Sequence, residues 1–534
     1  MITTFYNKNI GKLPYIILFT YCFCKIFITI QKPFQEIVYF LPDDASYYFK
    51  IAENLYNGFG FSFDTFNTTN GFHPLWQILI IPFFAFINEP EILVRTILVF
   101  QCLILTITGL LLIKVANKFF TSEIVLLLIV FYVYYVFSKS VNGMESAVLV
   151  FTISFFIFYF INNYSLEVIS LKEDYLLGIL ISLILLSRLD MIFLVITLPV
   201  FLIIVSKLKK IDLLKRLFII FLGFLSLFIP YIAFNFLSEG KLTPISGALK
   251  SSFPNLNNSI SLTGYPVEIW ISIALVLINI ILFLLVKFKI FNSPNFLKYN
   301  YTIVVVGISI FLTLVYTILF VKWGIFNWYY IIYFFYIPIA FVPVIQILFS
   351  LSFFKRFRFE YLLIIVACYF CYSLVKIELY RYDRTINAQE LHNMWHVQSY
   401  NAAKWAKANL DHRTIFGMTD AGHFSFFSQM RVVNLDGLVN NFKFQNILYE
   451  KKLSMYLRNL NVSHLVHHSF WMYSNINRDQ INEGNYNEIK LNFPSYLYNT
   501  FSDNIQLRKS KEIYRSPKYF DENEQSVFLI WQIE

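Results

Sequence analysis

Long apolar runs, separated by short polar segments, make up most of the first two thirds of the chain. The runs fall at residues 13–30, 92–113, 121–137, 147–161, 175–187, 191–205, 216–236, 267–286, 300–320, 329–350 and 360–376. A helix needs about 20 residues to cross a bilayer. The pattern therefore predicts about eleven transmembrane helices, some of them short for a full crossing.

Basic residues gather on every second link between these runs. They are Lys8 and Lys12; Lys114 and Lys118; Lys207, Lys209, Lys210, Lys215 and Arg216; Lys287, Lys289 and Lys298; and Lys355, Arg356 and Arg358. Because cytoplasmic links are enriched in Lys and Arg, this alternation predicts a cytoplasmic N-terminus. The link at 162–174, which holds more acid than base, is the exception.

A further apolar segment, residues 74–88, must stay on the outer surface for this alternation to hold. Its short length, with Pro82 inside it, is typical of an interfacial or re-entrant helix. If it crossed, Lys114 and Lys118 would move to the outer side and the charge pattern would be lost.

The polar links assigned to the outer side hold most of the unusual side chains. These links are residues 31–91, 138–146, 187–190, 237–266, 321–328 and the region after 377. We therefore expect a transmembrane domain at 1–376, with its first outer loop at 31–91, and an extracytoplasmic C-terminal domain at 377–534.

Composition supports this division. The chain has 534 residues, of which 57% are hydrophobic, and its mean hydropathy is +0.59. A soluble protein cannot cover so much apolar surface, which indicates a multi-pass protein of the lipid bilayer, expected in the inner (plasma) membrane. The net charge of +10 is explained by the basic links, so no nucleic-acid partner is expected.

Two adjacent carboxylates, Asp43 and Asp44, open a helix-like segment in the first outer loop. Acidic groups beside lipid are costly, so the pair indicates a site. Alternatively, Asp43 caps the helix and Asp44 offsets its dipole. The two roles can coexist, because helix N-terminal amides also stabilise a catalytic carboxylate.

Two more outer positions have the same ambiguity. His73 follows a turn at Asn70-Gly71 and precedes Trp76, which is typical of a membrane-interface anchor. Glu145 opens a spanning run, where it either complements the helix dipole or faces the first loop as another carboxylate.

Two cations are candidates for holding a phosphate. Arg188 and Asp190 interrupt two apolar runs, either as a neutralised pair in a short hairpin or with the guanidinium free for phosphate oxygens. Lys250 ends a run of small residues from Thr243 that either cradles a phosphate or is an ordinary loop.

The C-terminal region is richer in charge and has shorter apolar runs. Strands are expected near 416–423, 432–438, 462–467 and 527–533, and a helix near 402–410, which together predict a small α/β domain. His464, His467 and His468 have no Cys or Glu at ligand spacing, so no zinc site is predicted.

Several of these segments together resemble a known family. They are D-D-A-x-Y-Y-x-x-x-A-E-N from Asp43, N-G-F-H-P-L-W from Asn70, N-G-M-E-S-A from Asn142, R-L-D from Arg188, P-I-S-G-A-L-K from Pro244, and D-A-G and N-L-D-G-L in the tail. Their order is similar to that of bacterial and archaeal GT-C-type glycosyltransferases. More loosely, the chain resembles mycobacterial arabinofuranosyltransferases, protein O-mannosyltransferases and the aminoarabinose transferase of lipid A. It lacks the W-W-D-Y-G sequence of oligosaccharyltransferases and the MIR region of eukaryotic O-mannosyltransferases.

The resemblance implies a GT-C fold and an enzyme that transfers a sugar from a polyprenyl phosphate to an extracytoplasmic glycan, lipid or protein. It implies Asp44 or Asp43 as catalytic base with Glu145 as a neighbouring carboxylate, and a divalent metal (Mg or Mn) on Asp43 and Glu145. The phosphate-binding candidates are Arg188, Lys250 and His73, and the acceptor-side candidates are Asp190, Asp420 and Asp436. Single displacement at the anomeric carbon predicts inversion.

The competing function is a transporter or flippase of lipid-linked sugars. Such proteins place charges or broken helices near the membrane midplane, often in repeated halves. The sequence has neither an internal repeat nor a midplane charge cluster.

Overall fold

The computed structural model describes residues 10–257, 264–288, 297–350, 359–383, 395–521 and 524–533. Five of the basic residues used for the topology prediction, Lys8, Lys289, Lys355, Arg356 and Arg358, lie outside these ranges.

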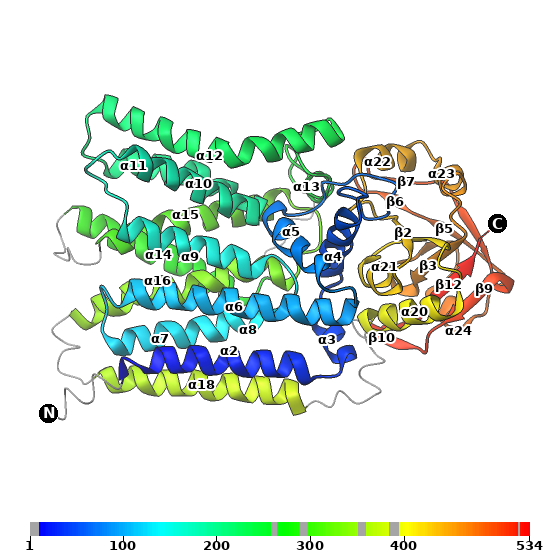
Figure 1. The fold of residues 1–534 in the computed structure, drawn as a ribbon, viewed down its shortest axis with the longest axis horizontal. Coiled ribbons are helices and arrows are strands. Elements are labelled where there is room, and N and C mark those ends of the chain that lie inside the picture. Colours follow the sequence, from blue (N-terminus) through cyan, green and yellow to red (C-terminus); the bar gives the residue numbers. More distant parts are fainter. Residues whose placement is uncertain are drawn as a thin grey trace.

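Each of the eleven predicted apolar stretches forms a helix. The helices are α2 (Leu13–Gln31), α6 (Pro90–Ala116), α7 (Ser122–Tyr132), α9 (Ser146–Asn162), α10 (Leu171–Ser187), α11 (Phe193–Val205), α12 (Lys210–Glu239), α14 (Val267–Lys287), α15 (Leu297–Phe320), α16 (Ile331–Ser350) and α18 (Phe359–Asp383). A π-helical turn at Val133–Phe137 and α8 (Ser138–Ser140) continue α7. The helices lie side by side along the long axis of the molecule (Figure 1).

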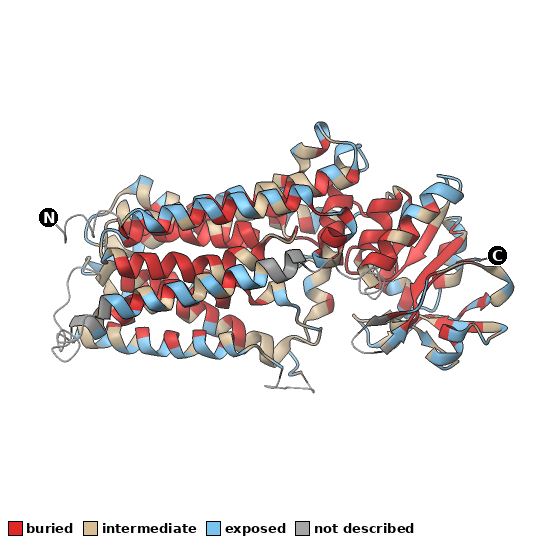
Figure 2. Cartoon of the chain, turned by 90° about the horizontal axis from the view of Figure 1, so that it is seen from below, coloured by how far each residue is buried: buried red, intermediate tan, exposed pale blue. Residues whose placement is uncertain are grey.

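Within the described ranges, eight helices are long and apolar enough to cross a membrane. The other three, α9, α10 and α11, have 17, 17 and 13 residues. Helix α2 exposes Ile16, Phe19 and Phe23, and exposed faces run along the outer helices while the inner faces are buried (Figure 2). Exposed apolar helix faces of this kind are compatible with a polytopic membrane protein.

Short helices fill the space between the long helices and the C-terminal domain (Figure 1). They are α3 (Phe34–Phe40), α4 (Asp43–Tyr56), α5 (Pro74–Ile80) with a 3₁₀ turn at Ile81–Ala85, and α13 (Ile245–Lys250). The apolar segment at 74–88 is therefore a short helix that changes to a tighter turn beside Pro82, which lacks a backbone N–H.

The C-terminal domain is built on a five-stranded mixed sheet in the order β2-β1-β3-β12-β9. These strands are β1 (Ile415–Met418), β2 (Arg431–Asn434), β3 (His464–His468), β9 (Glu512–Arg515) and β12 (Phe528–Gln532). Strand β1 is parallel to β2 and β3, whereas β12 is antiparallel to β3 and β9. The four strands predicted from the sequence are thus confirmed.

Helices and smaller strand pairs surround this sheet. The helices are α20 (Trp395–Asn409), α21 (Gly422–Ser428), α22 (Phe442–Tyr449), α23 (Leu453–Asn459) and α24 (Arg478–Glu483). The remaining strands are β4 (Tyr473–Ser474), β5 (Glu488–Asn492), β6 (Pro494–Ser495), β7 (Thr500–Phe501), β8 (Ile505–Arg508), β10 (Tyr519–Asp521) and β11 (Glu524–Ser526).

The predicted domain boundary at 376–377 falls within helix α18, which continues to Asp383. The first described element of the C-terminal domain is α20, which begins at Trp395. The rise in charge from residue 377 thus begins within the last turns of α18.

The C-terminal domain packs directly on residues 31–91, the segment predicted to be the first outer loop. The rings of Phe49 on α4 and Phe426 on α21 are 5.4 Å apart, and both residues are buried. Consequently one continuous apolar core joins the long helices, α4 and the sheet. Burial of aromatic area on this scale stabilises the contact between the two domains.

Candidate functional site

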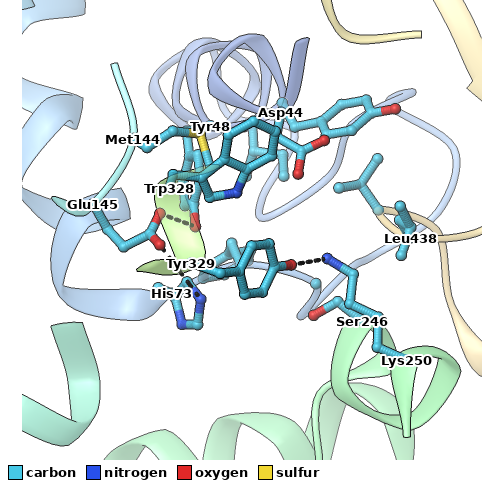
Figure 3. A pocket seen from close by; sticks show the side chains of 15 residues that line it. Asp44, Tyr48, His73, Met144, Glu145, Ser246, Lys250, Trp328, Tyr329 and Leu438 are labelled. Carbon is cyan, nitrogen blue, oxygen red and sulfur yellow. Dashed lines mark hydrogen bonds and ion pairs between the residues drawn. The ribbon is translucent and has the colours of Figure 1, made fainter. Parts of the chain in front are cut away.

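A small cavity lies where the outer segments meet the C-terminal domain (Figure 3). Its volume is about 60 Å³. The lining residues come from α4, the segment before α5, the segment before α9, α13, the segment before α16 and the turn after β2: Asp44, Tyr47, Tyr48, Ile51, Gly71, Phe72, His73, Met144, Glu145, Ser246, Lys250, Trp328, Tyr329, Leu438 and Val439. Asp44, His73, Glu145 and Lys250 are thus the predicted site residues that meet at one place.

The two adjacent aspartates have different surroundings. The carboxylate of Asp43 is buried and accepts hydrogen bonds from the backbone N–H groups of Gly422 (2.9 Å) and His423 (2.7 Å). Asp43 therefore binds the first amides of α21 in the C-terminal domain, whereas its own helix has no side-chain cap. Burial raises the pKa of Asp43 well above its usual range, although the two amides act in the opposite direction.

Three further contacts hold the same segment of the C-terminal domain on α4. Ala421 donates its N–H to the hydroxyl of Tyr47 (3.1 Å), and Ser46 Oγ lies 2.7 Å from His423 Nδ1. A Cβ atom on Gly422 would lie 2.2 Å from the carbonyl oxygen of Asp43. The predicted Asp-Ala-Gly motif is therefore a docking segment, and its glycine is required because the two backbones touch.

Asp44 points into the cavity (Figure 3). Within the described part of the chain, its carboxylate has no hydrogen bond and no ion pair. Burial raises its pKa to about 6, against the lowering effect of Lys250 and with further raising by Asp420, Asp436 and Glu145. Asp44 is thus a carboxyl group with a raised pKa that is directed at the space a ligand would enter.

Asp420 and Asp436 follow the carboxyl ends of the parallel strands β1 and β2. The carboxylate of Asp436 accepts hydrogen bonds from the N–H of Asp420 (2.9 Å) and the N–H of Leu438 (2.8 Å). Burial raises the pKa of both carboxyls. Neither lines the cavity, but both carboxylates raise the pKa of Asp44 electrostatically. The carboxyl ends of parallel strands are a usual place for ligand sites.

The other side of the site is held by an ion-pair network. Arg188 is buried and donates from Nη1 to Glu145 Oε1 (3.0 Å), and from Nη2 to Asp190 Oδ2 (2.6 Å) and Nε to Asp190 Oδ1 (3.2 Å). Its Nη1 also donates to the Trp328 carbonyl oxygen (3.1 Å). These partners use four of the five guanidinium N–H groups, and neither Arg188 nor Asp190 lines the cavity, so Arg188 is not placed to bind phosphate there. The alternative prediction, a neutralised pair in a short hairpin, describes the geometry.

Glu145 is fixed on both oxygens. Its Oε2 accepts a hydrogen bond from the hydroxyl of Tyr48 (3.1 Å), its Oε1 binds Arg188, and His73 Nε2 lies 3.9 Å away. Burial lowers the pKa of His73, against the raising effect of Glu145. Glu145 therefore faces the first outer loop, as one of the two predictions for it required.

Lys250 is the cation that reaches the cavity. Its Nζ donates to the hydroxyl of Tyr329 (2.6 Å). Burial lowers the pKa of Lys250, but Tyr329 and Asp44 outweigh that effect, so the pKa lies above its ordinary value. The ammonium therefore stays charged and faces the side of the cavity where Asp44 lies (Figure 3).

The residues proposed for a divalent metal do not fit one. Asp43 has both oxygens on backbone amides and Glu145 has both on Arg188 and Tyr48. Across the described residues, no group of three or more His, Cys, Asp or Glu side chains is placed to hold a metal ion. Magnesium prefers several free carboxylate or water oxygens, which this pair does not offer.

The shape of this site also depends on the turn at Asn70-Gly71 and on Gln101, which the sequence analysis did not single out. The side-chain oxygen of Asn70 accepts a hydrogen bond from the backbone N–H of Ile245 (2.9 Å), the first residue of α13. A Cβ atom on Gly71 would lie 2.1 Å from the carbonyl oxygen of Leu438. Gln101 accepts the N–H groups of Asn142 (3.1 Å) and Gly143 (2.9 Å). Gln101 could have been noticed as a lone amide in an apolar run.

The helical period could also have revealed Tyr47 and Tyr48. Each follows an aspartate by four residues, which places it on the same face of α4. Tyr47 accompanies Asp43 at the docking segment, and Tyr48 accompanies Asp44 at the cavity.

Residues 386–516 match a family model described as a domain of unknown function (DUF8728). The match covers most of the C-terminal domain up to the end of β9. No curated protein matches the chain.

Proposed function

We propose that this protein is a membrane glycosyltransferase of the GT-C type. It moves a sugar from a polyprenyl-phosphate donor to an acceptor hydroxyl outside the cytoplasm, on a glycan, a lipid or a protein. The single observation that carries the proposal is Asp44, a carboxylate without a fixed partner that faces a cavity also reached by Lys250.

The proposed membrane placement uses eleven crossings and a cytoplasmic N-terminus. It is supported by the position of α3, α4, α5 and α13 at the end that carries the C-terminal domain (Figure 1). The link between α11 and α12, which carries Lys207 and Lys209, lies at the opposite end (Figure 1). The cavity would then open on the extracytoplasmic side of the inner membrane.

A second, larger cavity offers space for the donor lipid. It has a volume of about 650 Å³ and is lined by α2, α3, the segment before α9 and the segment around Trp328, which also lines the small cavity. Its lining is mostly apolar, and its lysines are paired: Lys25 with Glu378 (3.3 Å), Lys32 with Glu36 (3.0 Å) and Lys139 with Glu268 (3.9 Å). A prenyl chain would lie here and present its phosphate near Trp328.

The chemistry is one displacement at the anomeric carbon. The acceptor oxygen forms the new bond to that carbon while the bond to the phosphate oxygen breaks. Asp44 takes the proton of the acceptor hydroxyl, and polyprenyl phosphate leaves with the bonding electron pair. The ammonium of Lys250 stabilises the negative charge that develops on the phosphate. Attack from the opposite face inverts the anomeric centre.

The small cavity must widen for this reaction. At about 60 Å³ it holds a few water molecules, whereas ligand sites usually measure about 300–1,000 Å³. Leu438 and Val439 close it from the C-terminal domain. We therefore place the opening movement between this turn and α4.

The experiment compares Asp43→Asn, Asp44→Asn and the exposed control Asp411→Asn in membranes supplied with a panel of labelled polyprenyl-phosphate sugars. We expect Asp44→Asn to lose transfer while Asp411→Asn keeps it. Full transfer by Asp44→Asn would end the assignment. Movement of the donor across the bilayer without a new glycosidic bond would instead favour the flippase. The donor panel is narrowed beforehand by deleting the gene and identifying the sugar that disappears from the cell-envelope glycans.

A further inference from the structure

A further polar cavity, separate from the two cavities described above, lies at the end of the C-terminal sheet away from the candidate active site. Its volume is about 510 Å³. It lies between α23, β8 and the end of β12, and Ser463, at the start of β3, forms part of its floor. In Figure 1 the end of β12 and α23 lie on the side of the domain away from the long helices. The candidate active site lies near the carboxyl ends of β1 and β2, whereas this cavity lies at the amino end of β3, which is parallel to β1.

The cavity is basic. Arg458, Arg508 and Lys511 line it, and none of the described lining residues is acidic. Glu488 lies opposite Arg508 in the register of β5 and β8, so Arg508 is partly offset. Arg458 and Lys511 are therefore the two cations proposed to meet a ligand in this cavity. A guanidinium and an ammonium facing one cavity favour a ligand with negative charge.

The rest of the lining is rich in amides and hydroxyls. It includes Asn461, Asn504, Gln506 and Gln532 together with Ser454 and Ser463. Side-chain amides both donate and accept hydrogen bonds, which suits a ligand that carries many hydroxyl groups. None of the described lining residues is aromatic, so the cavity lacks the stacking surfaces with which proteins bind single-stranded nucleic acid.

We propose that this cavity binds an anionic saccharide, one that carries carboxylate or phosphate groups. The volume fits the common range of about 300–1,000 Å³ for ligand sites, and it exceeds what a single small anion needs. Arg458 and Lys511 hold the charged groups, and the amides hold the ring hydroxyls. The binding needs no donor lipid and no transfer, so it is independent of the proposed function.

The test uses the full chain in detergent or nanodiscs and measures binding of a tetrasaccharide of galacturonic acid, with neutral maltotetraose and inorganic phosphate as comparison ligands. The charge-neutral double variant is Arg458→Gln with Lys511→Gln. The matched control is Lys407→Gln with Lys443→Gln, two exposed lysines that line none of the described cavities.

We expect the wild type to prefer the acidic tetrasaccharide over maltotetraose and phosphate, with an affinity that falls as salt rises. The Arg458 and Lys511 variant should bind the acidic tetrasaccharide about tenfold more weakly, since each exposed charge contributes little alone. The matched control should keep wild-type affinity. Equal binding of the neutral ligand, equal loss in the control, or no binding at millimolar concentration would overturn the proposal. Loss of transfer in Asp44→Asn with unchanged tetrasaccharide binding would separate the two proposals.

Discussion

The two sides of the candidate active site place their carboxylates in opposite surroundings, one with a fixed cation and one without. On the membrane-domain side, which we call the paired side, Glu145 and Asp190 share the guanidinium of Arg188. On the other side, the unpaired side, Asp44, Asp420 and Asp436 lie near one another, and in the described ranges none forms an ion pair with Lys or Arg. Both sides are similarly rich in carboxylates, so their number does not reveal which of them reacts.

The difference indicates which carboxylates hold the structure and which are available for chemistry. A buried carboxylate with a fixed cation is stabilised in its charged form and cannot readily take a proton. A buried carboxylate without one has a raised pKa and is free to accept a proton from a ligand. Under the proposed function, the paired side positions the site and the unpaired side supplies the base.

The largest expected effect comes from Asp44→Asn. Removing a general base typically lowers the rate by about 10²–10⁴-fold, so transfer should fall by that factor. The melting temperature should stay the same or rise, because burial and neighbouring carboxylates disfavour the Asp44 charge more than Lys250 favours it. Parallel measurement of transfer and thermal unfolding checks this, and a melting temperature that falls with activity would contradict the assigned difference between the sides.

The main effect of Arg188→Met should be a loss of stability. The substitution leaves Glu145 buried without its cation, which typically costs about 3–5 kcal/mol of unfolding free energy. The double variant Arg188→Met with Glu145→Gln should recover part of the loss. Thermal unfolding in detergent measures both. If Arg188 instead bound the donor phosphate, the single variant would unfold normally and lose only donor affinity.

Gly422→Ala should weaken the backbone contact between Gly422 and Asp43, which brings the C-terminal domain onto α4 at the unpaired side. The added Cβ would lie 2.2 Å from the Asp43 carbonyl oxygen, and such overpacking costs about 1–3 kcal/mol. Hydrogen exchange of the His423 amide, which donates to Asp43, should become faster.

Gly324→Ala is the matched control for this substitution. Its Cβ would meet only Phe326 at 3.8 Å, an ordinary contact. Unchanged exchange in Gly422→Ala, or equal acceleration in both variants, would show that the two backbones do not touch as described.

The smallest effect is a pH dependence carried by Asp44. Its pKa of about 6 in the folded protein exceeds the ordinary 3.8, so the folded state holds a proton that the unfolded state has lost between these values. The free energy of unfolding contributed by Asp44 therefore falls as pH rises from about 4 to about 6. The rate of transfer should increase as pH rises through about 6, because Asp44 must be ionised to act as the base.

The stability contribution is measured as the difference between wild type and Asp44→Asn at each pH. The difference is needed because buried histidines such as His423, whose pKa is lowered well below its usual value, act in the opposite sense. We expect the free energy of unfolding of Asp44→Asn to rise relative to that of the wild type as pH increases from about 4 to about 6. A constant difference would show that Asp44 has an ordinary pKa.

Much of the local structure could be predicted from residue patterns. Run length placed the long helices, turn residues placed the strands that begin near Phe416 and Val432, and the short run with Pro82 indicated a helix too short to cross. These features depend on neighbours within a few turns of chain, which the sequence order presents directly. The predicted boundary at 376–377 follows the change in composition, which comes before α18 ends at Asp383.

The different roles of Asp43, which binds the C-terminal domain, and Asp44, which faces the cavity, could not be predicted from the sequence. Consecutive positions on a helix point about 100° apart, but only the docking of the C-terminal domain decides that Asp43 meets the amides of Gly422 and His423. Likewise, Arg188 lies 43 positions from Glu145 in the chain, and nothing in either motif shows that they pair.

The sequence alone thus determined the elements, the membrane character and the set of charged residues gathered on the links between the apolar runs. The tertiary structure alone decided which of those charges are neutralised and which face an open space. The physical reason is that hydrophobic periodicity acts over short chain distances, whereas the partners of a buried charge come from distant segments. Arg188 and Glu145 lie 43 positions apart, and Asp43 and the amide of His423 lie 380 positions apart.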